Sequence, residues 1–175
     1  VAGVDIGKER AGERRERGAK TRAREAGNEA VMCGCMRESD ARLVQVINCR
    51  IVEKGARVVL AARRAKRLSA LVGRIESMGG EALAVTTDVT SEADVDNLFA
   101  QAVERFGTVD VLLNNAGIAD STPVDEMALE LWHRVIETNL TSAFLCSRAA
   151  FRVMKGKGRG RVVNIGSISA KVRRQ

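Results

Sequence analysis

The sequence has 175 residues, of which 45% are hydrophobic and 29% charged, a composition typical of one globular domain with its own core. No apolar run reaches the ~18 residues of a membrane span, and no apolar segment follows the N-terminus, so we expect neither a membrane segment nor a secretory signal. The net charge is +7, but aromatic residues make up only 3%, which disfavours nucleic-acid binding. We therefore expect a soluble cytoplasmic protein.

The cysteines are sparse and poorly spaced for a metal site. Cys33 and Cys35 form a lone C-x-C, Cys49 stands apart, and His133 is far away in the sequence. We predict no metal site and reduced thiols. Cys146 falls in a helical pattern, where a small core residue is expected.

The first 45 residues differ in composition from the rest of the sequence. The stretch 7–30 consists mainly of Arg, Glu, Gly and Ala, with almost no large apolar side chain to offset the entropy lost on ordering. We predict a basic segment over 1–45 that is disordered or lies outside the domain, and a partial nucleotide-binding domain over 46–175. A basic arm that binds a partner such as RNA is the alternative, although its glutamates interrupt the positive charge.

From residue 46 onward, short apolar runs alternate with amphipathic stretches. The predicted order is strand 57–63, helix 65–78, strand 82–88, helix 91–107, strand 109–117, helix 127–154 and strand 160–167. This alternation predicts an α/β fold, a partial doubly wound (Rossmann-like) parallel sheet with helices on both faces. Only four strands can be recognised, so we expect an unpaired apolar edge in the centre of the sheet and poor solubility.

Ligands bind at the carboxyl ends of the strands in such sheets. Arg63 and Arg64 lie at the end of the first predicted strand, where a dinucleotide would place its adenosine ribose, and arginine there favours a 2′-phosphate. Asp88 ends the second strand, either as a turn residue or as an acceptor for the adenine amino group.

The third and fourth strands also end in polar or small residues. Asn115, Ala116 and Gly117 follow an apolar strand, and glycine allows close approach of a flat ligand. Asn139 lies on the apolar stripe of the long helix, so its amide needs a partner, either in the sheet or beside a reactive centre. Ser167 ends the last strand.

Several motifs together resemble those of the short-chain dehydrogenase/reductase family. They are GARVVLAARR (55–64), TDVT (87–90), VDVLLNNAGI (109–118), ETNLTSAF (137–144) and GRVVNIGSIS (160–169). The resemblance implies hydride transfer between NAD(P)H and a small-molecule alcohol or carbonyl compound, and homo-oligomers are common in the family.

The resemblance also assigns roles to individual residues. Ser167 matches the serine that hydrogen-bonds the substrate oxygen, and Asn139 matches the helix asparagine that supports a proton relay. Asn115, Ala116 and Gly117 match the turn against the cofactor, and Asp88 with Val89 matches the adenine contact. Ala62 occupies the acidic position of NAD-preferring members and Arg63 follows it, so the implied cofactor is NADP(H).

Two parts of the family pattern are not found. Counting back from Glu53 places the glycines of the T-G-x-x-x-G-x-G loop at Glu38, Arg42 and Val44. The catalytic Tyr and Lys expected beyond Ser167 are missing, and the sequence contains no Tyr. We therefore predict a truncated or frame-damaged, inactive form of an NADPH-dependent oxidoreductase that does not bind NADPH; the alternatives are a non-enzymatic binding or regulatory relative and an active enzyme with divergent machinery.

Overall fold

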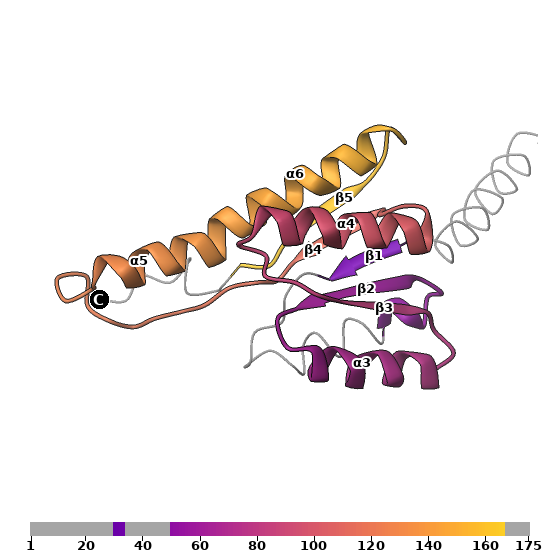
Figure 1. The fold of residues 1–175 in the computed structure, drawn as a ribbon, viewed down its shortest axis with the longest axis horizontal. Coiled ribbons are helices and arrows are strands. Elements are labelled where there is room, and N and C mark those ends of the chain that lie inside the picture. The colour runs from indigo at the N-terminus through magenta and orange to yellow at the C-terminus, as the bar shows by residue number, and fades with distance from the viewer. Residues whose placement is uncertain (1–29, 34–49, 167–175) are drawn as a thin grey trace, which may run out of the picture.

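The computed structural model describes residues 30–33 and 50–166, which form a parallel five-stranded sheet with helices on both faces (Figure 1). The strands are β1 (Ala30–Cys33), β2 (Arg57–Ala62), β3 (Ala82–Thr86), β4 (Val111–Asn114) and β5 (Arg161–Asn164). Their spatial order is β3-β2-β1-β4-β5, so the chain winds outward in both directions from β1. The predicted fold class is confirmed.

β1 is the main difference from the sequence analysis. It pairs in parallel with both β2 and β4, with Val31 opposite Val58 and Val111, and so fills the centre of the sheet. The expected gap between β2 and β4 is therefore wrong. Ala30–Cys33 lies within the segment predicted to precede the domain; the predicted boundary near residue 46 otherwise stays a prediction. The sequence pattern that indicates β1 is the four-residue apolar run Ala30–Cys33, which Gly34 ends. The run is short and lies within a strongly charged segment.

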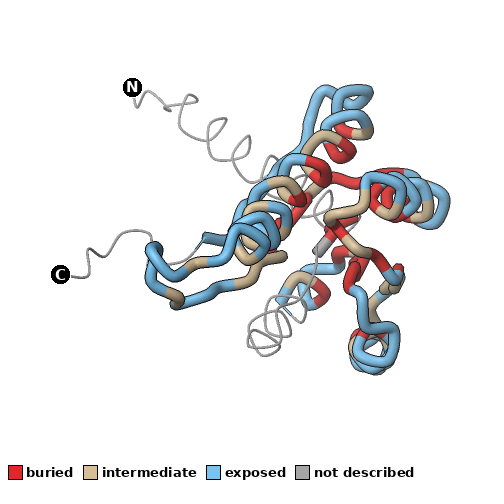
Figure 2. Tube along the Cα trace, turned by 60° about the vertical axis from the view of Figure 1, so that its left-hand side comes forward, coloured by how far each residue is buried: buried red, intermediate tan, exposed pale blue. Residues whose placement is uncertain are grey.

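The two faces of the sheet carry separate apolar cores. Helices α4 (Glu92–Phe106) and α6 (Ser142–Lys155) cover one face, and α3 (Ala65–Ser77) covers the other, as Figure 1 shows. Alternate strand residues supply the two cores: Leu112 packs toward α4 and α6, and Leu113 toward α3. The buried segments gather in the strands and on the inner sides of these helices (Figure 2).

Helix α4 begins and ends as its sequence predicts. The Ser91 hydroxyl accepts a hydrogen bond from the Asp94 N–H, which caps the N-terminus. Gly107 ends the helix in the left-handed region at φ 76°, a conformation that glycine adopts without strain.

The long helix predicted over 127–154 is continuous but contains a π-helical segment. It consists of α5 (Leu129–Ile136), the π-helix η1 (Glu137–Thr141) and α6. Part of the predicted apolar stripe is exposed, because Trp132, Leu140 and Phe144 are 51%, 64% and 58% accessible. Only α6 buries residues against the sheet, among them Cys146, which is 2% accessible as expected for a core residue.

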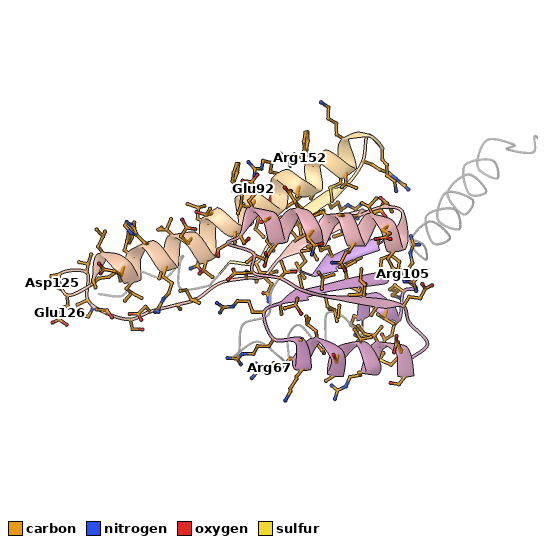
Figure 3. The ribbon with its side chains drawn as sticks, in the orientation of Figure 1. Arg67, Glu92, Arg105, Asp125, Glu126 and Arg152 are labelled. Carbon is orange, nitrogen blue, oxygen red and sulfur yellow. The ribbon has the colours of Figure 1, made fainter. Side chains whose placement is uncertain are left out.

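Ion pairs join α6 to α4 along their shared flank. Arg148 contacts Glu92, and Arg152 lies 3.5 Å from Asp96; Figure 3 labels Glu92 and Arg152 on the two neighbouring helices. All four side chains are substantially exposed, so each pair contributes at most about 1 kcal/mol. No helix within residues 50–166 is long and apolar enough to cross a membrane.

Candidate functional site

The carboxyl ends of all five strands lie at one edge of the sheet because every pairing is parallel. Arg63 and Arg64 leave β2 at this edge, and Arg64 is the N-cap residue of α3. Both arginines are exposed. The first turn of α3 contains no acidic residue, so this corner is strongly positive.

Asp88 lies beside this positive corner, two residues beyond the end of β3. Its Oδ1 atom accepts hydrogen bonds from the Thr90 N–H at 3.0 Å and the Thr90 hydroxyl at 2.8 Å. Burial alone would raise the pKa of the Asp88 carboxyl, but the Thr90 hydrogen bonds and the charge of Arg63 outweigh it, so the pKa is lowered. Asp88 is therefore a charged, fixed acceptor at physiological pH.

Val89 does not present its side chain to this edge. Val89 as a whole is 4% accessible, and its side chain packs in the core beneath α4. Of these two residues, the half-buried Asp88 is therefore the one that offers its side chain at this edge.

The end of β4 brings several polar groups into a buried position. Asn115 is 5% accessible, and its buried Nδ2 atom has no hydrogen-bond partner among the described residues. A buried amide N–H left without a partner costs about 1–3 kcal/mol. Ala116 and Gly117 follow and are half-buried. Within the described residues, the turn therefore holds a donor without a partner, close to a glycine that permits close approach of a ligand.

Asn139 connects the π-helix to the residue that follows this turn. Its Nδ2 atom donates to the Ile118 carbonyl at 2.8 Å, and its Oδ1 atom accepts from the Ile118 N–H at 2.7 Å. The amide on the apolar stripe thus has the partner that it needs, in the main chain of the loop after β4. π-helical segments within α-helices are frequent at functional sites.

Two elements of the predicted site lie outside the described residues: Ser167 and the segment expected to hold the glycine-rich loop. Because β1 ends at Cys33, the motif can instead be counted forward from the strand, which places its glycines at Gly34, Glu38 and Asp40. One of the three glycines is then present, a match that the count from Glu53 missed. The group of metal-binding side chains that a metal site would need is not found in the part of the chain that the structure describes.

These features define a class of protein: a doubly wound, Rossmann-like α/β fold. Arg63, Asp88 and Asn115 follow the carboxyl ends of its strands, and Asn139 holds the loop after β4. The sequence model of the short chain dehydrogenase family matches residues 43–175, most of the chain. The chain belongs to this family, and the predicted resemblance is confirmed.

Known relatives share the fold but are longer. A 3-oxoacyl-[acyl-carrier-protein] reductase from Synechocystis is 40% identical over 112 residues, which are 64% of this chain and 45% of the relative. The structure of an actinorhodin polyketide ketoreductase with NADPH superimposes with a TM-score of 0.76 at 34% identity, covering 84% of this chain and 56% of that one. NAD+-bound xylitol dehydrogenase gives 0.75 at 27% identity, covering 82% and 55%. The chain thus spans about half the length of these relatives.

Proposed function

We propose that this chain is the nucleotide-binding part of an NADPH-dependent oxidoreductase that interconverts a carbonyl group and an alcohol in a small-molecule substrate. Family membership supports the oxidoreductase class. The reductase and the ketoreductase among its relatives support a carbonyl substrate. The carbonyl chemistry is proposed for a protein of the relatives' length, because this chain spans about half of them.

The observation that carries the proposal is the buried, unpartnered Nδ2 atom of Asn115 at the ligand edge. Buried polar groups are almost always satisfied, so a donor without a partner among the described residues indicates a ligand acceptor nearby. The Asn115–Gly117 turn follows β4, next to the central strand β1, where a dinucleotide crosses such a sheet. The residues at the carboxyl ends of β2, β3 and β4 therefore fit a bound NAD(P)H. The predicted lack of NADPH binding rests on the glycine-rich loop, which lies outside the described residues, and it stays a prediction.

Arg63 supports NADPH over NADH. It is exposed, lies close enough to lower the pKa of Asp88, and stands at the corner with no acid in the first turn of α3. The 2′-phosphate of NADPH would bind next to the Arg63 cation. The ribose hydroxyls of NADH would lack the carboxylate that accepts their hydrogen bonds in NAD-preferring members, because Ala62 occupies that position.

The chemistry divides between the cofactor and the chain. Bound NADPH would supply the hydride. Asn139 would hold the Ile118 main chain and thereby the loop after β4, and Ser167 would donate a hydrogen bond to the substrate oxygen. The proton donor of the family is a tyrosine, and the 175 residues contain none, so we expect no turnover from these residues alone.

Binding of the adenosine end of the cofactor can be tested separately, because it requires neither the pyrophosphate loop nor the catalytic tyrosine. We expect 2′-AMP to bind the chain about tenfold more tightly than 5′-AMP in calorimetric titrations, because only 2′-AMP places its phosphate at Arg63. Arg63→Ala should abolish the difference, whereas Arg74→Ala, an exposed arginine in the last turn of α3, should preserve it. Equal affinities for the two nucleotides would contradict NADPH preference, and NADPH oxidation with a carbonyl substrate would contradict the expected lack of turnover.

A further inference from the structure

The side chain of Asn114 joins three elements at the end of β4. Its Nδ2 atom donates to Asn164 Oδ1 on β5 at 2.9 Å and to Ser147 Oγ on α6 at 3.2 Å. An amide nitrogen carries two hydrogens, so these two acceptors use both. The Ala143 carbonyl, at 3.5 Å, is a weaker third contact. Asn114 is 8% accessible, so its amide is committed to these partners.

The hydrogen bonds of Asn114 hold a part of β5 that has few other contacts. Within the described residues β5 pairs only with β4, and residues 161–166 are all exposed. Asn164 stands opposite Asn114, and the Ile165 N–H donates to the Asn114 carbonyl at 2.9 Å. The carboxyl end of β5 is thus held by main-chain bonds and by one side-chain bridge that also reaches α6.

This end of β5 leads directly to the candidate site. Asn164 precedes Ser167 by three residues, and Asn114 immediately precedes Asn115. A shift of the β5 end relative to β4 would therefore move the serine relative to the turn that faces the cofactor. Orientation errors of this kind are costly in catalysis.

We infer that Asn164 and Ser147 are positioning residues, which anchor the carboxyl end of β5 to β4 and α6 through the Asn114 amide. The inference rests on the proposed function for its relevance to Ser167. Both residues are proposed to act through their hydrogen bonds to Asn114.

Amide hydrogen exchange tests this inference in the full chain. Asn164→Leu removes the oxygen that accepts from Asn114 and should speed exchange of the Ile165 amide hydrogen about tenfold. Exchange of β2 amides such as that of Leu60 should not change, because only a local hydrogen bond is lost. Asn164→Asp keeps an oxygen acceptor and should restore slow exchange at Ile165. Asn97→Leu, an exposed asparagine on α4, is the matched control and should change neither amide.

If Asn164→Leu does not fold, Ser147→Ala provides a second test, because alanine keeps α6 helical. It should also speed exchange at Ile165, because Asn114 loses one of its two acceptors. Unchanged Ile165 exchange in both variants, an equal rise in β2 and β5, or a failure of Asn164→Asp to restore slow exchange would overturn the inference. The binding of 2′-AMP depends on Arg63 and not on Asn164 or Ser147. A lack of 2′-AMP binding would therefore contradict the proposed function without affecting the hydrogen-exchange test of the β5 anchor.

Discussion

Asn139 and Ile118 are joined by two reciprocal hydrogen bonds, 21 residues apart in sequence, which fix the loop after β4 to the π-helical segment. A single amide side chain thus satisfies both main-chain groups of one residue. The loop following Asn115–Gly117 is held at the place where the long helix passes the ligand edge. This relationship connects the Asn115–Gly117 turn, through Ile118, to the long helix.

Replacing Asn139 by alanine should lower the free energy of unfolding by about 1 kcal/mol. Two hydrogen bonds of about 0.5–1.5 kcal/mol each are lost, and the higher helix propensity of alanine offsets part of this loss. Urea unfolding followed by circular dichroism measures the change. Asn97→Ala is the control, because the exposed Asn97 also lies in a helix, and among the described residues its amide oxygen accepts a hydrogen bond only from Gln101 on the same helix. Equal stability of the two variants would argue against the Asn139 clamp.

Two glycines around α3 should respond in opposite ways to alanine. Gly73 lies inside α3 with no atom within 4 Å of an added Cβ, so Gly73→Ala should stabilise the chain by about 0.5–1 kcal/mol. At Gly80 an added Cβ would lie 2.3 Å from Val52 Cγ1, so Gly80→Ala should destabilise it by about 1–3 kcal/mol. Thermal melts of both variants measure the difference, and a shift of the same sign in both would refute this packing of Val52.

The lowered pKa of Asp88 predicts a pH dependence of stability. The folded pKa lies below the ordinary value of 3.8, so the carboxylate stabilises the fold above about pH 4, and this contribution is lost as the pH falls through the folded pKa. Asp88→Asn keeps an oxygen acceptor for Thr90 but removes the charge. The stability advantage of the native chain over this variant should therefore shrink between about pH 6 and pH 3. An advantage of constant size in urea unfolding at both pH values would disagree with the lowered pKa.

The exposed apolar edge at β5 predicts self-association of the 175-residue chain. Val162, Val163 and Ile165 are 40–42% accessible, and β5 has one strand neighbour in the described part of the sheet. A charge on such an edge opposes strand pairing between molecules, so Val163→Lys should raise the monomer fraction in sedimentation velocity. Val124→Lys adds the same charge at a 90% accessible position away from the sheet and should have no such effect. A native chain that is monodisperse and melts cooperatively would contradict the prediction.

The sequence predicted the elements with strong periodicity and missed the one without it. Helices α3 and α4 follow from stripes that end at glycine, and β2 follows from a run of β-branched residues. β1 contributes only Ala30–Cys33, and its position in the sheet depends on pairing with strands 27 and 80 residues away, which no local pattern encodes.

The candidate site was predictable in part for the same reason. Polar residues after apolar strands indicated Asp88 and Asn115, since parallel strands bring their carboxyl ends together. The polar amide on an apolar stripe showed that Asn139 needs a partner, but the identity of that partner, the Ile118 main chain, depends on the packing of a loop. Likewise, the burial of Val89 depends on α4 covering it.

The most direct test of the central claim is a map of where 2′-AMP binds, from the shifts of backbone amide signals in NMR spectra of the full chain. The proposed function predicts that the largest shifts occur at Arg63, Arg64 and Asp88, at the carboxyl ends of β2 and β3. Shifts confined to other surfaces, or no shifts at saturating nucleotide, would contradict a nucleotide-binding role for this edge of the sheet.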